Sequence, residues 1–338
     1  MNRFKIKGVA AALVSSALLL SACGENNAAN ENGGNDAAGN NNNTNTNETE
    51  NNNSNMNETE NNANNQEEDG LYITASFSVI ADMTEQVLGD RGTVDYIVPI
   101  GEEPHEYEPV PSDFRNVSDS DVFYVNGLGL EEWLERIVDN ASDTPVFTLA
   151  EGVSEIPLEG ESAPDPHAWL SPKNASYYIE NIVDDLSERD PDGEDIYREN
   201  ADAYLEEINE LDAWIEEKVD AVPEEHRTIV VSENAFKYFG EDYGFETEGI
   251  WEINSHEEGT SGQINRLIDV IQDKEIPAVF VETTVDKRYM ETVAENAGVE
   301  IAGEVYTDAV GQEGSGAETY LEMLRHNAEV LTDGLSGN

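Results

Sequence analysis

The chain has 338 residues, with 73 acidic and 17 basic side chains and a formal net charge of −56. This excess of acids disfavours nucleic acid as a partner, because phosphate contacts depend on Lys and Arg. The single cysteine, Cys23, excludes a disulfide within the chain.

The first residues have the pattern of an export signal. A basic start, MNRFKIK, precedes the apolar stretch VAAALVSSALLL and the small residues before Cys23. About a dozen apolar residues are too few for the ~20 that a membrane-spanning helix needs. The tetrapeptide LSAC resembles a bacterial lipobox, which predicts a signal peptide over residues 1–22 and lipidation of Cys23. The alternative is an ordinary secreted protein with one free thiol.

The next segment has the composition of a tether. Residues 24–69 contain 20 Asn, ten acids, no Lys or Arg, and only Met56 as a large apolar side chain. Such a segment cannot form a core. We therefore expect residues 23–69 to be a disordered tether with a mean reach of roughly 35–40 Å.

Residues 70–338 are themselves very acidic, with 63 acids, 14 bases and a net charge of −49. We interpret this charge as a surface adapted to high salt or high pH, and a cation-scavenging surface is the alternative. Two series of strand-like segments alternate with helical ones, which predicts an α/β fold with two lobes, residues 70–190 and 227–338. The predicted strands are 71–77, 93–100, 121–126 and 144–149 in the first lobe, and 227–233, 246–252, 276–283 and 300–306 in the second.

The segment between the lobes, residues 191–226, predicts one long linking helix. Apolar side chains recur at helical spacing over residues 195–222, and no Gly or Pro interrupts them before Pro223. A helix of about 28 residues spans roughly 42 Å. A rigid helix between two lobes favours rocking over wide hinge opening.

Four side chains that could bind a metal lie just past predicted strands: His105, His167, Glu233 and Asp308. Ligands of open α/β sheets bind beyond the carboxyl ends of the strands, so these side chains can converge. Two imidazoles and two carboxylates suit Mn(II) or Fe(II), with Zn(II) as the alternative.

Each of the four also has a simpler interpretation when taken alone. The two histidines could be ordinary loop residues, Glu233 could be the anion at a helix N-terminus, and Asp308 could be one of many surface acids. Asp165 is close enough in sequence to accept a hydrogen bond from the outer nitrogen of His167, as metal-bound imidazoles usually require. The other histidines, His226, His256 and His326, are assigned to the surface.

Several long motifs resemble one known family. GEEPHEYEPVPSD, DPHAWLSPKNA, SENAFKYFGEDYGF, IWEINSHEEGTS, VFVETTVDKRYMETVAENAGV and VYTDAVG resemble, in order and spacing, the metal-binding lipoproteins of manganese and zinc ABC importers. The resemblance covers residues 70–335. It implies two lobes of parallel sheet flanked by helices and joined by one long rigid helix, with the ion held between the lobes by His105, His167, Glu233 and Asp308.

Two departures from the zinc-importing members favour Mn(II). Those members generally have a histidine as the third ligand and often a His-rich loop before the second. Here the third position is Glu233, and residues 151–166 contain acids and no histidine. A carboxylate in place of an imidazole makes the site harder.

The expected function is therefore that of a receptor. The resemblance implies an extracytoplasmic, lipid-anchored monomer that captures Mn(II), or alternatively Fe(II) or Zn(II), and delivers it to an ABC permease driven by an ATPase. It predicts no enzymatic activity. The rival hypotheses are a secreted metallohydrolase, with an open metal position for water, and an adhesin.

Overall fold

The structure is a computed structural model that describes residues 70–338, except 139–142, 161, 254–258 and 338. These residues belong to one compact unit. The predicted signal peptide, Cys23, the tether and His256 lie outside the described residues. Within the described part of the chain, every helix is too short or too polar to cross a membrane.

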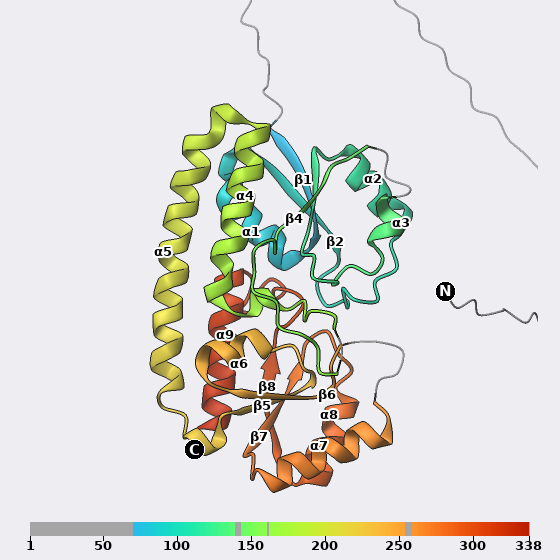
Figure 1. Ribbon diagram of the computed structural model, residues 1–338, viewed down its shortest axis with the longest axis vertical. Coiled ribbons are helices and arrows are strands. Elements are labelled where there is room, and N and C mark those ends of the chain that lie inside the picture. The colour runs from blue at the N-terminus through green and yellow to red at the C-terminus, as the bar shows by residue number, and fades with distance from the viewer. Residues whose placement is uncertain (1–69, 139–142, 161, 254–258, 338) are drawn as a thin grey trace, which may run out of the picture. The chain divides into compact units, whose positions relative to one another are not determined.

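The first half is built on a sheet of four parallel strands in the order β2-β1-β3-β4 (Figure 1). They are β1 (Leu71–Phe77), β2 (Gly92–Val98), β3 (Val122–Val125) and β4 (Val146–Thr148). All of β3 is buried, as is β1 from Ile73 onward. Such continuous apolar burial is typical of parallel strands with both faces covered.

The second half contains two parallel pairs, β5–β6 and β7–β8. The strands are β5 (Thr228–Glu233), β6 (Glu246–Trp251), β7 (Ala278–Glu282) and β8 (Glu300–Val305). Strands β5 and β7 are neighbours, so the two pairs adjoin. Each of the eight predicted strands therefore occurs, and the predicted α/β class with parallel sheets flanked by helices is confirmed.

The flanking helices come from both halves of the chain. They are α1 (Ser78–Leu88), α2 (Pro111–Asp119), α3 (Leu134–Val138), α4 (Ala175–Arg189), α6 (Lys237–Tyr243), α7 (Ser261–Asp273), α8 (Arg288–Ala297) and α9 (Tyr320–Leu335). Thr260 and Thr319 form capping boxes at the starts of α7 and α9, where their hydroxyls accept a backbone N–H of the first turn. These caps explain why the two helices begin where they do.

The long helix α5 (Glu194–Val219) runs past both groups of strands (Figure 1). It ends three residues earlier than predicted, because residues 220–222 turn before Pro223. Its apolar side chains pack on α1 and α4 from the first half and on α9 from the second. One continuous apolar core includes residues of all four helices, so α5 joins the halves through packing along its length.

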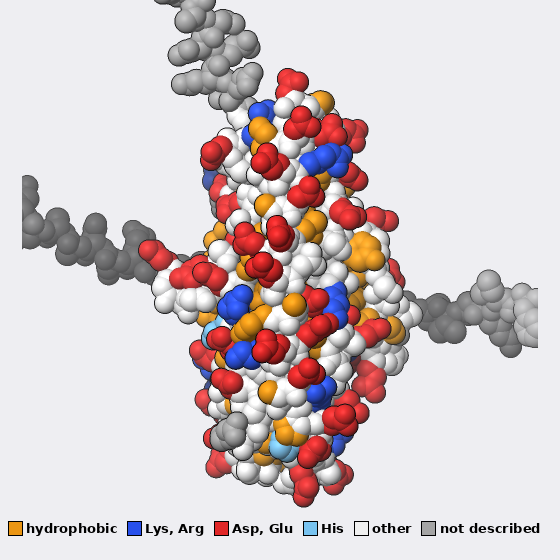
Figure 2. Space-filling model, turned by 90° about the vertical axis from the view of Figure 1, so that its left-hand side faces the viewer, with side chains coloured by type: hydrophobic (Ala, Val, Ile, Leu, Met, Phe, Trp, Pro, Cys, Tyr) orange, Lys and Arg blue, Asp and Glu red, His pale blue; other side chains and the backbone are white. Residues whose placement is uncertain are grey.

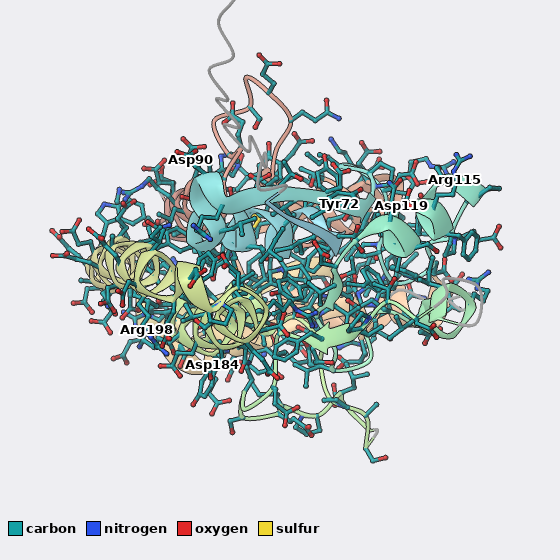
Figure 3. All side chains as sticks on the ribbon, turned by 90° about the horizontal axis from the view of Figure 1, so that it is seen from above. Tyr72, Asp90, Arg115, Asp119, Asp184 and Arg198 are labelled. Atoms are coloured by element: carbon teal, nitrogen blue, oxygen red, sulfur yellow. The ribbon has the colours of Figure 1, made fainter. Side chains whose placement is uncertain are left out.

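The outer face of α5 is polar. Figure 2 shows this side of the molecule with acidic side chains spread along it and fewer basic ones. Helices α4 and α5 lie side by side, and Asp184 and Arg198, labelled in Figure 3, line a shallow pocket between them. The acidic character predicted from composition is therefore found on the folded surface as well.

Candidate metal centre

The structure brings all four predicted side chains to one buried place, two from each half of the chain. The Nε2 atoms of His105 and His167 are 3.2 Å apart. Oε1 of Glu233 lies 3.4 Å from Nε2 of His105 and 3.7 Å from Nε2 of His167, and Oδ1 of Asp308 lies 3.5 Å from Nε2 of His167. Donor atoms that share one ion at about 2.0–2.2 Å must lie about 3–4 Å apart. The donors of His105, His167 and Glu233 meet this condition together, and Asp308 adjoins them through His167.

His105 is presented by an irregular loop that follows β2. The carbonyl of Pro104 accepts a 2.7 Å hydrogen bond from the indole N–H of the buried Trp133. The Tyr107 hydroxyl donates to Asp113 at 2.9 Å, and Asp113 also accepts the backbone N–H of Val110 at 2.7 Å. The loop is thus tied on both sides of His105 to neighbouring elements, which fixes the direction of the imidazole.

His167 is oriented by Asp165, as the sequence suggested. Oδ1 of Asp165 accepts the backbone N–H of His167 at 2.9 Å and lies 2.9 Å from its Nδ1. A hydrogen bond at Nδ1 leaves Nε2 to face the centre of the cluster. The other oxygen of Asp165 lies 3.2 Å from Nζ of Lys237 at the start of α6, so the second half of the chain supports His167 from outside.

Glu233 and Asp308 come from the second half. Glu233 is the last residue of β5, and its backbone N–H donates to Glu282 at the end of β7 at 2.7 Å. Asp308 follows β8, and its Oδ2 accepts the hydroxyls of Thr307 at 2.5 Å and Thr284 at 3.2 Å. These bonds leave Oδ1 of Asp308 facing His167, and that oxygen has no hydrogen-bond partner.

Residues 73–334 match the family described as ZnuA, zinc-uptake complex component A, periplasmic. The chain belongs to this family. The resemblance found in the motifs is thereby confirmed.

Individual members of the ZnuA family and related structures support the same assignment. The manganese-binding lipoprotein MntA of Halalkalibacterium halodurans is 60% identical over 271 residues, which is 80% of this chain and 90% of that protein. The iron ABC transporter substrate-binding lipoprotein MtsA of Streptococcus pyogenes is 40% identical over 280 residues, covering 80% and 90%.

Among solved structures, the Mn-bound periplasmic metal-binding protein of Candidatus Liberibacter asiaticus is 31% identical, with a TM-score of 0.73 over 78% of this chain and 99% of that one. The zinc-binding protein TroA of Treponema pallidum is 25% identical, with a TM-score of 0.75 over 79% and 99%. Almost the whole length of each of the two solved structures is therefore matched by the fold of this chain.

The two imidazoles of this ZnuA-family centre differ in charge. Burial and the nearby His167 lower the pKa of His105 to about 3, so His105 is neutral. Burial also opposes protonation of His167, but attraction and hydrogen bonding to Asp165, with further help from Asp308 and Glu233, hold its pKa well above 6.5. His105 can therefore accept an ion directly, whereas His167 must first lose a proton.

Sequence reasoning missed two acids beside the centre. Oε1 of Glu103 lies 3.9 Å from Nε2 of His105, and Glu103, Glu233 and Asp308 each place an oxygen within 4.8 Å of the others. For Glu103, the only signal in the sequence is its position two residues before His105. Glu282 ends β7 after four buried residues, the same pattern that singled out Glu233, and burial raises its pKa to about 7.

Two of the remaining histidines are half-buried rather than fully on the surface. Nδ1 of His226 lies 3.0 Å from the carbonyl of Leu335, and Nε2 of His326 lies 3.0 Å from the carbonyl of Glu304. Their contacts are thus with backbone carbonyls, and neither is among the described residues that could share an ion at the centre.

Proposed function

We propose that this chain is the substrate-binding lipoprotein of an ABC importer and that its cargo is Mn(II), bound by His105, His167, Glu233 and Asp308. The observation that carries the proposal is the buried cluster of His105, His167 and Glu233, whose donor atoms lie 3.2–3.7 Å apart, with Oδ1 of Asp308 3.5 Å from Nε2 of His167. The metal is cargo, so the chain needs no chemistry on it. The family is one of binding proteins, and the chain is not an enzyme.

The donor set supports Mn(II) over Zn(II). Carboxylate oxygens suit harder ions and allow bidentate binding, which a structural tetrahedral zinc site does not need. The relative with 60% identity is named for manganese, whereas one with 40% identity is named for iron. Fe(II) therefore remains the second candidate cargo, because its ligand preferences overlap those of Mn(II).

A hydrolase is disfavoured by the crowding of the centre. Hydrolysis by a bound metal requires an open position for water and a nearby general base. Here the donors of His105, His167 and Glu233 lie close together, Asp308 adjoins them at His167, and all four side chains are at most 2% exposed. The same enclosure suits a receptor, which must hold the ion until it meets its partner.

The membrane partners follow from the class of protein. As an ABC-importer lipoprotein the chain works with a permease and an ATPase, from a position outside the cytoplasm and anchored to the membrane. We assign residues 1–22 to a signal peptide, Cys23 to the lipid anchor and 23–69 to a tether. We further propose that the two lobes, 70–190 and 227–338, are joined by residues 191–226 and act as a monomer without nucleic acid.

The stoichiometry and the choice of ion test this proposal. Metal-free protein is exposed to Mn(II) in the presence of excess Ca(II) and Mg(II) and analysed by native mass spectrometry. We expect one Mn(II) per chain, because Ca(II) and Mg(II) prefer sites made of oxygen alone. Several weakly held ions, or equal loading with Ca(II), would contradict a dedicated transition-metal site.

A further inference from the structure

Glu103 differs from the other groups around the centre in its exposure. The side chains of the four proposed ligands are buried, whereas the side chain of Glu103 is 20% exposed. Within the described residues that could share an ion there, Glu103 is the one group that is not buried. An ion that arrives from solvent on this side therefore meets Glu103 before it meets the buried donors.

The geometry also allows Glu103 to reach inward. Its Oε1 accepts the backbone N–H of His105 at 3.0 Å, which holds the carboxylate over the histidine. From there it lies 3.9 Å from Nε2 of His105, and one of its oxygens lies within 4.8 Å of oxygens of Glu233 and Asp308. Oδ1 of the fully buried Asp308 accepts no hydrogen bond and lies 3.5 Å from Nε2 of His167, so it can take over an ion from Glu103 inside the centre.

Glu103 also lines a surface pocket. The pocket has a volume of about 510 Å³, and besides Glu103 its lining includes three exposed acids, Glu102, Glu106 and Glu108. A concave surface lined by one sign of charge raises the local concentration of counter-ions and their rate of association. The charged residues of its lining are all acidic, so the pocket attracts cations next to Glu103.

We propose that Glu103 is an entry ligand, meaning the first protein carboxylate to bind the incoming ion, which it then passes to the buried donors. This inference rests on the proposed function and adds a residue to it. Glu103 has no required place in the closed centre, because the other four residues already supply two nitrogens and at least two oxygens. It lowers the barrier to capture and, equally, the barrier to release.

The test compares Glu103→Gln with Glu108→Gln in the metal-free protein. Both variants remove one negative charge from the same pocket, and the glutamine oxygen at position 103 can still accept the His105 hydrogen bond. Mn(II) association and dissociation are followed by stopped-flow tryptophan fluorescence, for which Trp169 is a reporter because its ring lies 5.2 Å from that of His167. The rates are measured at low salt and at about 1 M salt, where the Debye length is about 3 Å.

At low salt we expect both variants to bind more slowly, because both weaken the attraction of the pocket for cations. At high salt only Glu103→Gln should remain slow, by about tenfold in both association and dissociation, with little change in Kd. Equal rates for the two variants at high salt would overturn the entry role. So would a weaker Kd caused by faster dissociation alone, since Glu103 would then belong to the closed centre. If the unaltered protein binds no Mn(II), the proposed function itself fails, and this inference fails with it.

Discussion

His167 carries the clearest consequence at the scale of single residues. In the metal-free protein its pKa lies well above 6.5, so the imidazole is protonated at neutral pH, whereas a metal ligand must be neutral. His105, with a pKa of about 3, has no proton to lose there. We therefore expect about one proton to be released per Mn(II) at pH 7, and the affinity to rise with pH by up to about tenfold per unit until the pKa of His167 is passed.

Calorimetry in buffers of different ionisation enthalpy measures this release. The observed binding heat should vary linearly with the ionisation enthalpy of the buffer, with a slope that corresponds to about one proton per Mn(II). A binding heat that is the same in every buffer at pH 7 would show that His167 is already neutral and would contradict the charge assignment.

Glu233 is the residue on which the preference for Mn(II) depends most. Replacing it with histidine would supply a third imidazole and favour tetrahedral zinc. We expect Glu233→His to raise the affinity for Zn(II) relative to Mn(II) by about tenfold or more. Glu233→Gln, which loses the charge without gaining an imidazole, is the control, and competition titrations give the ratio. An unchanged ratio in the histidine variant would remove Glu233 from the selectivity argument.

The four proposed ligands could be selected from the sequence because each follows a predicted strand or lies in a proline-rich loop beyond one. Glu103 could not, because one more acid in a loop does not stand out in a chain with 73 acids. Glu282 shows the strand-end pattern of Glu233 and could have been found. Only tertiary structure reveals that it accepts the backbone N–H of Glu233 and is not among the described residues that could share an ion at the centre.

At the scale of elements, helix α6 connects the two halves behind His167. Lys237, in its first turn, lies 3.2 Å from Asp165 and 2.6 Å from Glu252, which follows β6. The ammonium group therefore compensates the buried carboxylate that orients His167. Groups that support a ligand in this way typically change metal affinity by 10–100-fold when removed.

We expect Lys237→Met to weaken Mn(II) binding by about tenfold or more, because Asp165 loses its cation and its hold on His167. Lys287→Met is the matched control, since Lys287 pairs with Glu304 on the exposed surface. Surface pairs contribute about 0–1 kcal/mol, so this control should bind as the unaltered protein does. The affinities are measured by calorimetry. Similar values for the unaltered protein and the two variants would show that the Lys237–Asp165 ion pair does not contribute to metal binding.

Helix α5 is the element that holds the halves together. Leu211 is 1% exposed in the apolar core shared with α9 and the first half. Leu211→Ala should lower the free energy of unfolding by about 2–5 kcal/mol, while Glu210→Ala on the exposed face should change it by about 0.5 kcal/mol or less. Denaturant unfolding measures both. A small effect at Leu211 would mean that the halves do not depend on α5 packing.

The course of α5 could be predicted from the spacing of its apolar residues, and its end could be predicted to within three residues from Pro223. The arrangement of the strands could not. Sequence patterns located all eight strands, but the order β2-β1-β3-β4 and the adjacency of β5 and β7 depend on contacts between residues far apart in the chain. The pattern of a single strand indicates which of its faces is buried, but it does not specify which other strands lie beside it.

At the scale of the whole molecule, the acidic surface and the buried centre both attract cations, but in different ways. Residues 70–338 carry a net charge of −49, so the surface attracts cations of every kind at low ionic strength. This attraction is not selective and is screened by salt. The buried centre is different, because its donors lie close together and away from solvent, where screening is weak. A specific site must therefore persist when surface binding has been removed.

The most direct test of the account is calorimetric titration of Mn(II) into the metal-free protein at about 0.15 M and about 1 M salt, beside the His105→Ala and Glu233→Ala variants. We predict one Mn(II) site that survives high salt in the unaltered protein and is lost in both variants. Binding that disappears at high salt, or that both variants retain as the unaltered protein does, would place the ion on the acidic surface and contradict the centre described here.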